Sequence, residues 1–331
     1  MKILILFSEA HTSNREDLLD TMLQVKEIKQ SLHDLGYTID TYAFSSSLGQ
    51  TEETLKNIKP DCVFNLVESI DGRDANLHCA TSLLEFLNLP YTGCPSYVLS
   101  LLNSKVRHKK WLQQLNLPTP DFLTFTDLVC KKPMLKLNQN DLYMIKSDTE
   151  HGSLGLNNDS VVQGKNQILQ MIMHKKEQYK GDWFAEKFIV GREFNISMLE
   201  QAHTSSCDVL PIAEMQFVGF PDTKHHIVDY EAKWHENSWV SQATQRSFVC
   251  TEKDKNLFTE LKKLSKQCWD NFALRGAARV DVRVDEDGKP WILEINPNPC
   301  LTKDAGFMAA AQQMRLNHKD VIERLIQKRI D

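Results

Sequence analysis

The sequence predicts a protein of mixed α/β and α+β class, with an N-terminal parallel sheet, a small central domain and a C-terminal α+β domain. Length is the first indication, because 331 residues exceed what one hydrophobic core usually serves. Apolar strands alternate with amphipathic helices over the first 90 residues, which indicates a parallel sheet with right-handed crossovers. Two alternating strands around Asp287-Gly288 indicate an antiparallel hairpin near the other end.

The N-terminal domain is expected to cover residues 1–97. Apolar runs predict strands at 1–7, 38–44, 62–68 and 90–93, and helical spacing of apolar residues predicts helices at 17–35, 52–58 and 76–87. Ligands of open parallel sheets bind beyond the carboxyl ends of the strands, so we expect a binding crevice there. The first strand is not followed by the three closely spaced glycines of a dinucleotide-binding turn, so the sequence lacks that fingerprint.

The central and C-terminal domains are expected to cover 98–185 and 186–331. A helical connection at 96–117 opens the central domain and ends at the prolines that follow it. Further strands are predicted at 141–147, 183–191 and 192–200, and an amphipathic helix at 319–329 ends the chain.

Composition excludes several classes of protein. A net charge of -5 without a basic face argues against a nucleic-acid partner. No apolar run approaches the ~18–20 residues of a membrane span, and the apolar run at 1–7 is too short for a signal peptide, so no membrane partner is expected. The eight cysteines are scattered without C-x-x-C pairs, which is typical of reduced, mostly buried thiols in a cytoplasmic protein.

The hairpin around Asp287-Gly288 is expected to gather four polar side chains on one face. A symmetric two-residue turn places Asp281 opposite Glu294 and Arg279 opposite Asn296. Opposed carboxylates destabilise a strand pair unless a positive charge lies between them. Mg²⁺ carried in with a phosphate suits the oxygen donors of Asp281, Glu294 and Asn296, and Arg279 could bind a phosphoryl oxygen. The alternative is an ordinary hairpin whose charges face water.

A loop of small residues at 149–155 follows the predicted strand that ends near Lys146. Backbone N–H groups of Gly152 and Ser153, with the Ser153 hydroxyl, could cradle phosphates. The alternative is a surface turn with an exposed lysine. A separate group, His225, His226 and His235, has a spacing compatible with zinc, but no second cluster accompanies it, and we expect exposed loop histidines.

The strand Arg279-x-Asp281 and the strand Leu293-Glu294-x-Asn296, which ends at Pro297, together resemble the magnesium site of the ATP-grasp superfamily. The surrounding sequence is similar to D-alanine–D-alanine ligase-like proteins over nearly the whole chain. The resemblance is strongest at 181–199, 229–234 and 277–299. It implies an ATP-grasp fold, with ATP and two Mg²⁺ ions bound, and with Mn²⁺ as a possible substitute.

The resemblance also implies roles for individual residues. Lys105 and Lys146 match the two nucleotide-facing lysines of the family, and Ser153 lies in its phosphate loop. The segment Glu186-Lys187-Phe188-Ile189 matches the hinge that binds adenine, and Glu193 matches the carboxylate that binds the ribose. Catalytic matches are Lys233, on a loop that closes over the γ-phosphate, Arg279 with a backbone N–H near Cys300 as oxyanion donors, and Glu16 with Arg15 at the amino group of the first substrate.

Four positions depart from the pattern of the family. Gly152 stands in place of a serine and Trp234 in place of a tyrosine. In the family, that serine and that tyrosine close over the first substrate together with the glutamate that Glu16 matches. Ala305 stands where a serine binds the carboxylate of the second substrate, and Cys300 replaces a glycine. The nucleotide and metal half of the site is therefore expected to be intact and the amino-acid half altered.

These observations predict an ATP-dependent carbon–nitrogen ligase that joins two amino acids, or an amino acid and an amine, through an acyl phosphate. Its partners are expected to be amino-acid-like small molecules, and the family adds the expectation of a homodimer. One alternative is an ATP-binding module or pseudoenzyme without ligase activity. Another is an ATP-grasp enzyme that acts on a carboxylate other than an amino acid.

Overall fold

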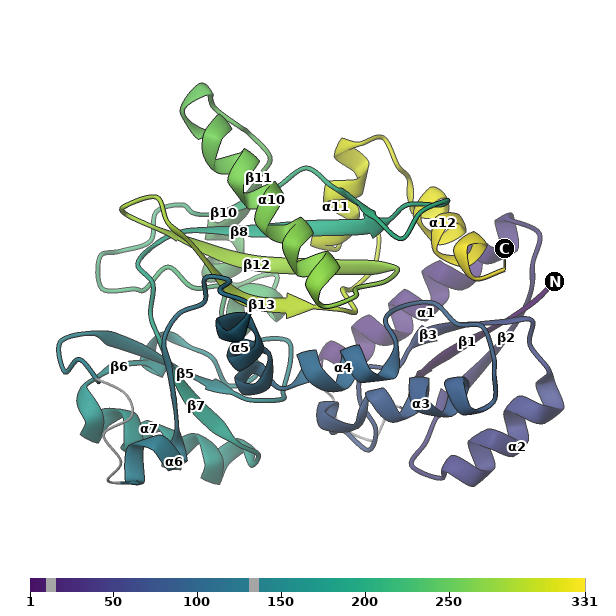
Figure 1. The fold of residues 1–331 in the computed structure, drawn as a ribbon, viewed down its shortest axis with the longest axis horizontal. Helices are drawn as coiled ribbons and strands as arrows, with labels where there is room; N and C mark the ends of the chain where they lie inside the picture. The colour runs from purple at the N-terminus through teal and green to yellow at the C-terminus, as the bar shows by residue number, and fades with distance from the viewer. Residues whose placement is uncertain (10–15, 131–136, 331) are drawn as a thin grey trace.

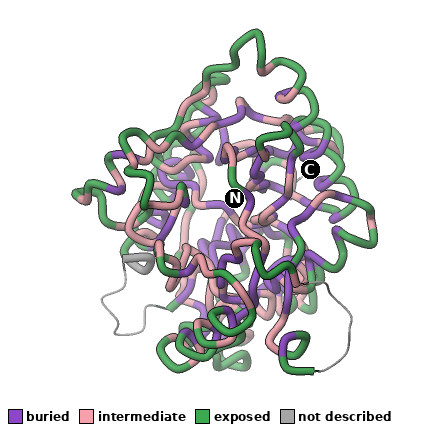
Figure 2. Tube along the Cα trace, turned by 90° about the vertical axis from the view of Figure 1, so that its left-hand side faces the viewer, coloured by how far each residue is buried: buried purple, intermediate pink, exposed green. Residues whose placement is uncertain are grey.

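The computed structural model describes residues 1–9, 16–130 and 137–330, without the side chains of 16–18 and 330. It contains three sheets, each with helices packed against it (Figure 1). The buried residues lie in the interior of the trace and the exposed ones at its rim (Figure 2). Fold class and the parallel N-terminal sheet are as predicted.

The N-terminal sheet has the parallel strand order β2 (Thr38–Phe44), β1 (Lys2–Ser8), β3 (Cys62–Leu66). Alternate residues of β1 point to opposite faces. Ile3 and Ile5 pack against α1 (Glu16–Asp34), while Leu4 and Leu6 pack with α2 (Leu48–Ile58) and α3 (His78–Phe86). The strand predicted at 90–93 is wrong, because only one parallel bridge, Val63 to Tyr91, forms there.

The central sheet is antiparallel, with the order β4 (Phe122–Thr124), β7 (Trp183–Lys187), β5 (Leu142–Ser147), β6 (Val161–Gln163). Two helices, α6 (Phe125–Val129) and α7 (Gly164–Tyr179), cover it. The buried residues of its core all lie between Leu123 and Ala185. This part of the chain therefore has a core of its own.

The C-terminal sheet has the antiparallel order β11 (Thr244–Ser247), β10 (Ala213–Phe217), β8 (Gly191–Glu200), β12 (Ala277–Asp285), β13 (Pro290–Asn296), and β9 (Cys207–Val209) also pairs with β8. Its core is shared with α10 (Lys255–Asn271), α4 (Ser96–Asn103) and α5 (Lys105–Gln114). The helix predicted at 96–117 is interrupted at Ser104, which is extended and caps α5 by accepting a hydrogen bond from the Arg107 N–H.

The N-terminal and C-terminal parts share a second core. Residues of β1, β3 and α1 pack with α11 (Gly306–Gln313) and α12 (His318–Ile330) (Figure 1). Polar contacts join the same parts. The N–H of Leu301 donates to Gln24 Oε1 at 2.7 Å, and its carbonyl lies 2.9 Å from His318 Nε2. His318 Nδ1 in turn lies 2.7 Å from Ser31 Oγ on α1.

The hairpin register is confirmed, but its turn differs from the prediction. Arg279 pairs with Asn296, and Asp281 with Glu294. The loop has three residues, 286–288, rather than two, because the Asp285 N–H bonds the Lys289 carbonyl and Gly288 adopts φ +81°. That turn alone would shift Glu294 opposite the buried Val280.

A bulge in β13 corrects this shift. Val282 pairs with Ile292 while Asp281 pairs with Glu294, so Leu293 is the extra residue between them. The bulge returns Glu294 to the face of Asp281, because a shift by one residue exchanges the two faces of a strand.

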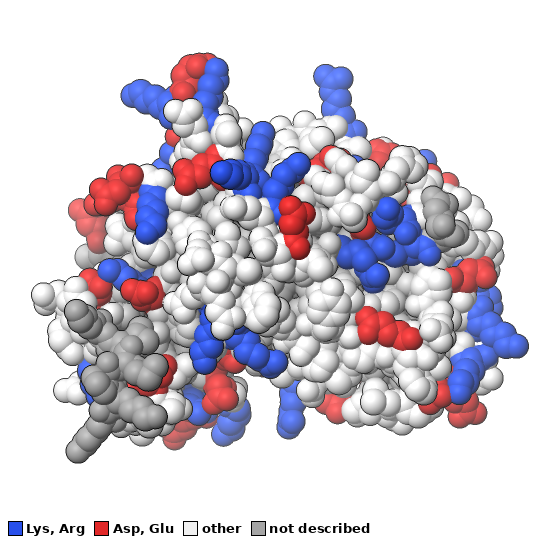
Figure 3. Space-filling model, in the orientation of Figure 1, with Lys and Arg blue, Asp and Glu red and all other residues white. Residues whose placement is uncertain are grey.

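Surface charge, cysteines and helix lengths agree with the composition. Positive and negative side chains are interspersed on the face shown in Figure 3, around an area of uncharged residues. All eight cysteines are free, as expected, but only Cys62, Cys94, Cys207 and Cys268 are buried, and Cys130 and Cys250 are exposed. Within the described part of the chain, no helix combines the length and the apolar character needed to cross a membrane.

Candidate functional site

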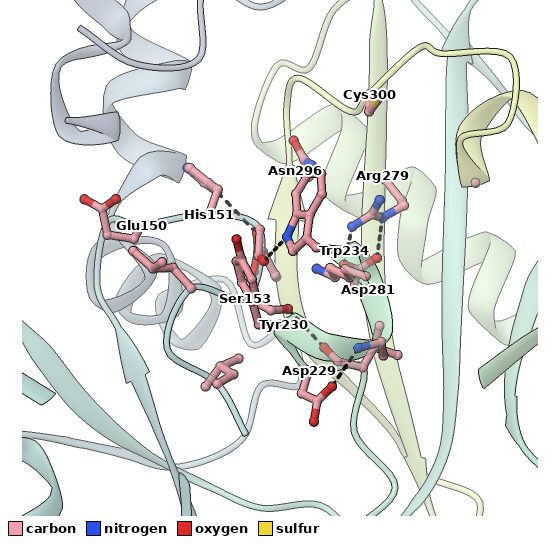
Figure 4. A pocket seen from close by; sticks show the side chains of 18 of the residues that line it. Glu150, His151, Ser153, Asp229, Tyr230, Trp234, Arg279, Asp281, Asn296 and Cys300 are labelled. Atoms are coloured by element: carbon pink, nitrogen blue, oxygen red, sulfur yellow. Dashed lines mark hydrogen bonds and ion pairs between the residues drawn. The ribbon is translucent and has the colours of Figure 1, made fainter. Parts of the chain in front are cut away.

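A cleft of about 1110 Å³ lies among the three sheets, and predicted site residues line it. Figure 4 shows part of this lining, with Ser153, Arg279, Asp281 and Asn296 among the labelled side chains. Thirteen of the fourteen site residues predicted above line it: Lys105, Lys146, Ser153, Glu186, Lys187, Phe188, Ile189, Glu193, Lys233, Arg279, Asp281, Glu294 and Asn296. The remaining one is Glu16, whose side chain, like the whole of Arg15, lies outside the described residues. The gathering of residues so far apart in sequence makes this cleft the candidate active site.

The Asp281 carboxylate is held by neighbours on its own and the adjacent strand. Arg279, two residues earlier on β12, donates from Nε to Oδ1 at 2.7 Å and from Nη2 to Oδ2 at 2.8 Å. Asn195, opposite on β8, donates to Oδ1 at 2.9 Å. Burial opposes the charge of Arg279, but the carboxylates of Asp281 and Glu294 outweigh it and raise the pKa of Arg279.

Glu294 also faces the cleft, but its negative charge has no positive partner as close as the one that Arg279 provides for Asp281. Its Oε2 lies 4.0 Å from Lys105 Nζ, and its Oε1 lies 3.6 Å from His151 Nδ1. Burial alone would raise the pKa of this carboxyl, but Lys105, His151 and Lys233 hold it well below its ordinary value. The group is therefore an anion that still has room for a closer positive partner.

The donors on this face fit a magnesium ion that arrives with a phosphate. Asp281, Glu294 and Asn296 offer hard oxygen atoms, which Mg²⁺ prefers, and Glu294 lacks a close counter-charge. Among the described residues, no group of three or more His, Cys, Asp or Glu side chains forms a metal cage. The cation would therefore need ligands from the substrate as well as from the protein.

Glu186 forms buried ion pairs with two lysines beside the cleft. Glu186 lies between Lys109 Nζ, at 2.6 Å, and Lys146 Nζ, at 2.7 Å. Burial raises the pKa of Glu186, but the two lysines outweigh it and lower the pKa. Lys105, one helical turn before Lys109, donates to the Glu150 carbonyl at 2.8 Å. The Glu186 side chain thus supports Lys146 rather than facing solvent at an edge.

The segment after β7 is held by Arg283, which is buried. Its guanidinium donates to Glu193 Oε2 at 3.0 Å, to the Ile189 carbonyl at 2.7 Å and to the His226 carbonyl. It also lies over the Phe188 ring, 4.8 Å from the centroid. Lys187 pairs with Asp141 at 2.7 Å, and this hydrogen bond raises the pKa of Lys187.

A short helix, α8 (Tyr230–Trp234), forms one wall of the cleft. Asp229 caps it by accepting from the Ala232 N–H at 2.9 Å. Trp234 Nε1 donates to the Gly152 carbonyl at 2.9 Å, which joins α8 to the loop after β5. Lys233 is accessible to water in the cleft, yet crowding by protein and the charge of Arg279 lower its pKa.

The far end of the cleft carries the residues that depart from the expected pattern. The Cys300 thiol donates to Asp20 Oδ2 on α1 at 3.2 Å, and burial raises its pKa, so it stays protonated. Ala305 is the N-cap of α11 and makes no side-chain cap there. Arg246 on β11 donates to the Asp304 carbonyl at 3.2 Å beside it.

Sequence reasoning missed four residues of the site. Two had a usable signal, because Lys109 lies four residues after Lys105 on one helix face and Arg283 continues the alternation of Arg279 and Asp281. Asn195 required knowledge that β8 lies beside β12. His151 had no signal, because its partners come from three distant segments.

The three loop histidines do not form a zinc site in the described residues. His226 is exposed and stacks on Phe217 with ring centroids 5.1 Å apart, and His235 is exposed. His225 is half-buried against Phe188, so the expectation of exposure was wrong for this one.

Two antiparallel sheets that enclose the cleft, one carrying Lys146 and the other the opposed carboxylates of Asp281 and Glu294, are the architecture of an ATP-grasp protein. The family described as D-ala D-ala ligase C-terminus matches residues 111–327, about two thirds of the chain. This protein therefore belongs to the D-alanine–D-alanine ligase family.

Individual relatives agree with this assignment. The chain is 26% identical over 310 residues to a D-alanine–D-alanine ligase of Marinomonas sp. (strain MWYL1), covering 92% of this chain and 89% of the relative. It is 26% identical over 327 residues to that of Aquifex aeolicus, covering 98% and 100%. The solved structure of the Bacillus anthracis D-alanine–D-alanine ligase complexed with ATP has the same fold, with a TM-score of 0.72 at 18% identity, covering 100% of this chain and 97% of that one.

Proposed function

We propose that the protein is an ATP-dependent carboxylate–amine ligase that joins two amino acids, or an amino acid and an amine. The observation that carries the proposal is the Asp281–Glu294 pair, opposed across a bulged hairpin on the wall of a cleft that also holds Lys105, Lys146 and Lys233. Two anions on one face destabilise a strand pair, and a polyphosphate with its cation is a ligand that would use them.

The nucleotide is proposed to lie between the central and C-terminal sheets. The segment Glu186 to Ile189 would bind the adenine, Glu193 the ribose, and Ser153 with the lysines the phosphates. ATP would bring Mg²⁺, or Mn²⁺ in its place, to Asp281, Glu294 and Asn296, where the ion would neutralise charge on the phosphates. We propose three domains with the limits expected from the sequence, 1–97, 98–185 and 186–331, except that α4 and α5 pack in the core of the C-terminal domain.

The chemistry is proposed to run in two displacements. A substrate carboxylate oxygen attacks the γ-phosphorus, ADP leaves, and an acyl phosphate forms. The amine of the second substrate then attacks the acyl carbon, and inorganic phosphate leaves with formation of the amide and release of a proton. Arg279 and the backbone N–H near Cys300 would stabilise the oxyanion, an effect worth ~3–4 kcal/mol per donor.

Helix α8 is proposed to act as a lid that excludes water from the acyl phosphate, which would otherwise hydrolyse. Trp234 supports this role, because its indole bonds the phosphate loop at Gly152. Glu16 is proposed to bind the amino group of the first substrate. Substrate contacts differ from those of D-alanine–D-alanine ligase at Gly152, Trp234, Cys300 and Ala305, so the substrates need not be D-alanine.

The test is ADP release from ATP and Mg²⁺ over a panel of single and paired D- and L-amino acids, with mass spectrometry of the products. A product lighter than the two substrates by one water supports the ligase. ATP binding without ADP release from any pair supports a nucleotide-binding module instead. Asp281→Asn and Glu294→Gln should each lower ADP formation at least a hundredfold, about 2.7 kcal/mol, and near wild-type rates would contradict the assignment.

Location and assembly remain proposals that rest on the cysteine pattern and the resemblance. We propose a cytoplasmic protein that acts on small molecules as a homodimer. Light scattering of the purified protein tests the dimer.

A further inference from the structure

His151 lies in the cleft beside Glu294 but has no role in the function proposed above. It projects from the loop after β5, and its side chain is 28% exposed to the cleft. Its backbone N–H donates to Asp74 Oδ2 at 2.9 Å, which holds the loop against the N-terminal part of the chain. The position of the imidazole is therefore set by the protein before any ligand binds.

The neighbours of His151 determine which of its ring nitrogens carries a proton. Asn103 is buried, and its Nδ2 donates to the Asp74 carbonyl at 2.9 Å. The Asn103 Oδ1 therefore faces His151 Nε2, at 2.6 Å. A carbonyl oxygen only accepts, so Nε2 carries the hydrogen. In the neutral ring this leaves the lone pair on Nδ1.

The Nδ1 lone pair faces a carboxylate. It lies 3.6 Å from Glu294 Oε1, which is beyond hydrogen-bond distance, while the other oxygen of Glu294 is directed to Lys105. The imidazole already favours the charged form of Glu294, and a divalent cation held between Nδ1 and Oε1 would stabilise that charge more strongly. Nitrogen and oxygen donors bind first-row divalent ions at about 2.0–2.2 Å, and donors 3.6 Å apart can then share one ion at an angle of roughly 115°.

We propose that His151 Nδ1 and Glu294 Oε1 bind the same divalent cation when ATP is present, which rests on the proposed function. The nitrogen ligand would make this site prefer Mn²⁺ or Co²⁺ to Mg²⁺. Magnesium favours an all-oxygen shell, whereas imidazole nitrogen strengthens binding of transition-metal ions. The cation site of this chain would then differ from the oxygen-only set of Asp281, Glu294 and Asn296.

Electron spin echo envelope modulation on bound Mn²⁺ tests the proposal, because it detects nitrogen bonded to the ion. The full-length protein is loaded with Mn²⁺ and a non-hydrolysable ATP analogue. Expected is a ¹⁴N signal that changes when the protein carries ¹⁵N-histidine, since nitrogen from adenine would stay ¹⁴N. The signal should vanish in His151→Gln and persist in His235→Gln, a matched change at another histidine of the cleft.

Titration of the two metals gives a second readout. His151→Gln should weaken Mn²⁺ binding about tenfold or more, with a much smaller loss for Mg²⁺. A spectrum that ¹⁵N-histidine leaves unchanged, while Mn²⁺ and nucleotide still bind, overturns the role of His151 and leaves the ligase proposal standing. Failure of Mn²⁺ and the nucleotide to bind at all overturns both. The labelling experiment uses wild-type protein, so it does not depend on the folding of a variant.

Discussion

Replacement of Lys109 by methionine should destabilise the protein by about 3 kcal/mol. The Lys109 side chain is fully buried, and its ammonium lies 2.6 Å from Glu186. Attraction at that distance is about 6 kcal/mol at an effective dielectric of 20, and dehydration of two ions offsets much of it. Removal of one partner leaves the other charge buried, which typically costs about 3–5 kcal/mol. Lys146 still pairs with Glu186 at 2.7 Å, so the lower end applies.

The assay is thermal unfolding followed by circular dichroism, together with the KM for ATP. A loss of about 3 kcal/mol corresponds to roughly 6–12 °C for chains of 150–250 residues, and to the lower value for a longer chain. The KM for ATP should rise, because Lys146 is drawn closer to Glu186 when its competitor is gone. Lys110→Met is the matched control, since Lys110 is the exposed next residue. A midpoint within about 1 °C of wild type would refute this reasoning.

Three further predictions concern the lid, the hinge and the N-terminal part of the protein. Gly152→Ala should weaken lid closure by about 1–2 kcal/mol, because Gly152 has φ +66° and a Cβ there would lie 3.3 Å from the Trp234 ring. Unchanged tryptophan emission and an unchanged KM for ATP would contradict this prediction. Gly181→Ala is the control, since Gly181 has a similar φ at an open position. Arg283→Met should lower ATP affinity about tenfold, since Glu193 loses its cation and the Ile189 carbonyl loses its hydrogen-bond donor. Wild-type affinity in calorimetry would show that Arg283 does not hold these groups for ATP binding. Glu85 is exposed, and hydrogen bonds from Ser96 and Tyr91 outweigh its limited burial and lower its pKa. Its stabilising effect is therefore complete above the ordinary pKa of a glutamate and is lost as pH falls through the lowered value. The difference in unfolding midpoint between wild type and Glu85→Gln should therefore shrink on acidification from about pH 6 to pH 3. A constant difference would show that the charge of this carboxylate does not stabilise the protein.

Much of the fold could be predicted because local patterns and tertiary structure agree. The continuous apolar run of β1 matches its two buried faces, and the two strands of the hairpin lie on either side of Asp287-Gly288, as predicted. The break at Ser104 could not be predicted from periodicity, because Asp148 stabilises it from a distant loop by accepting from the Ser104 hydroxyl and the Val106 N–H.

The site was predicted where chemistry follows strand alternation and missed where it depends on distant segments. Asp281 and Glu294 were paired correctly although the turn was wrong, because the bulge at Leu293 offsets the three-residue loop. No local rule places a bulge at Leu293, between Ile292 and Glu294. The ion pairs of Lys109 and Arg283, and the position of His151, follow from packing between sheets that periodicity does not describe.

The distribution of the cores determines how the cleft can open. The N-terminal and C-terminal sheets are joined by shared apolar packing and by the contacts of Gln24 and His318 with Leu301, so they act as one body. Helix α5 belongs to that body, whereas the central sheet has its own core. The pair Lys109–Glu186 therefore spans the boundary between the two bodies, at the base of the cleft. A rotation of the central sheet about this buried charge pair would open the cleft and leave both apolar cores intact.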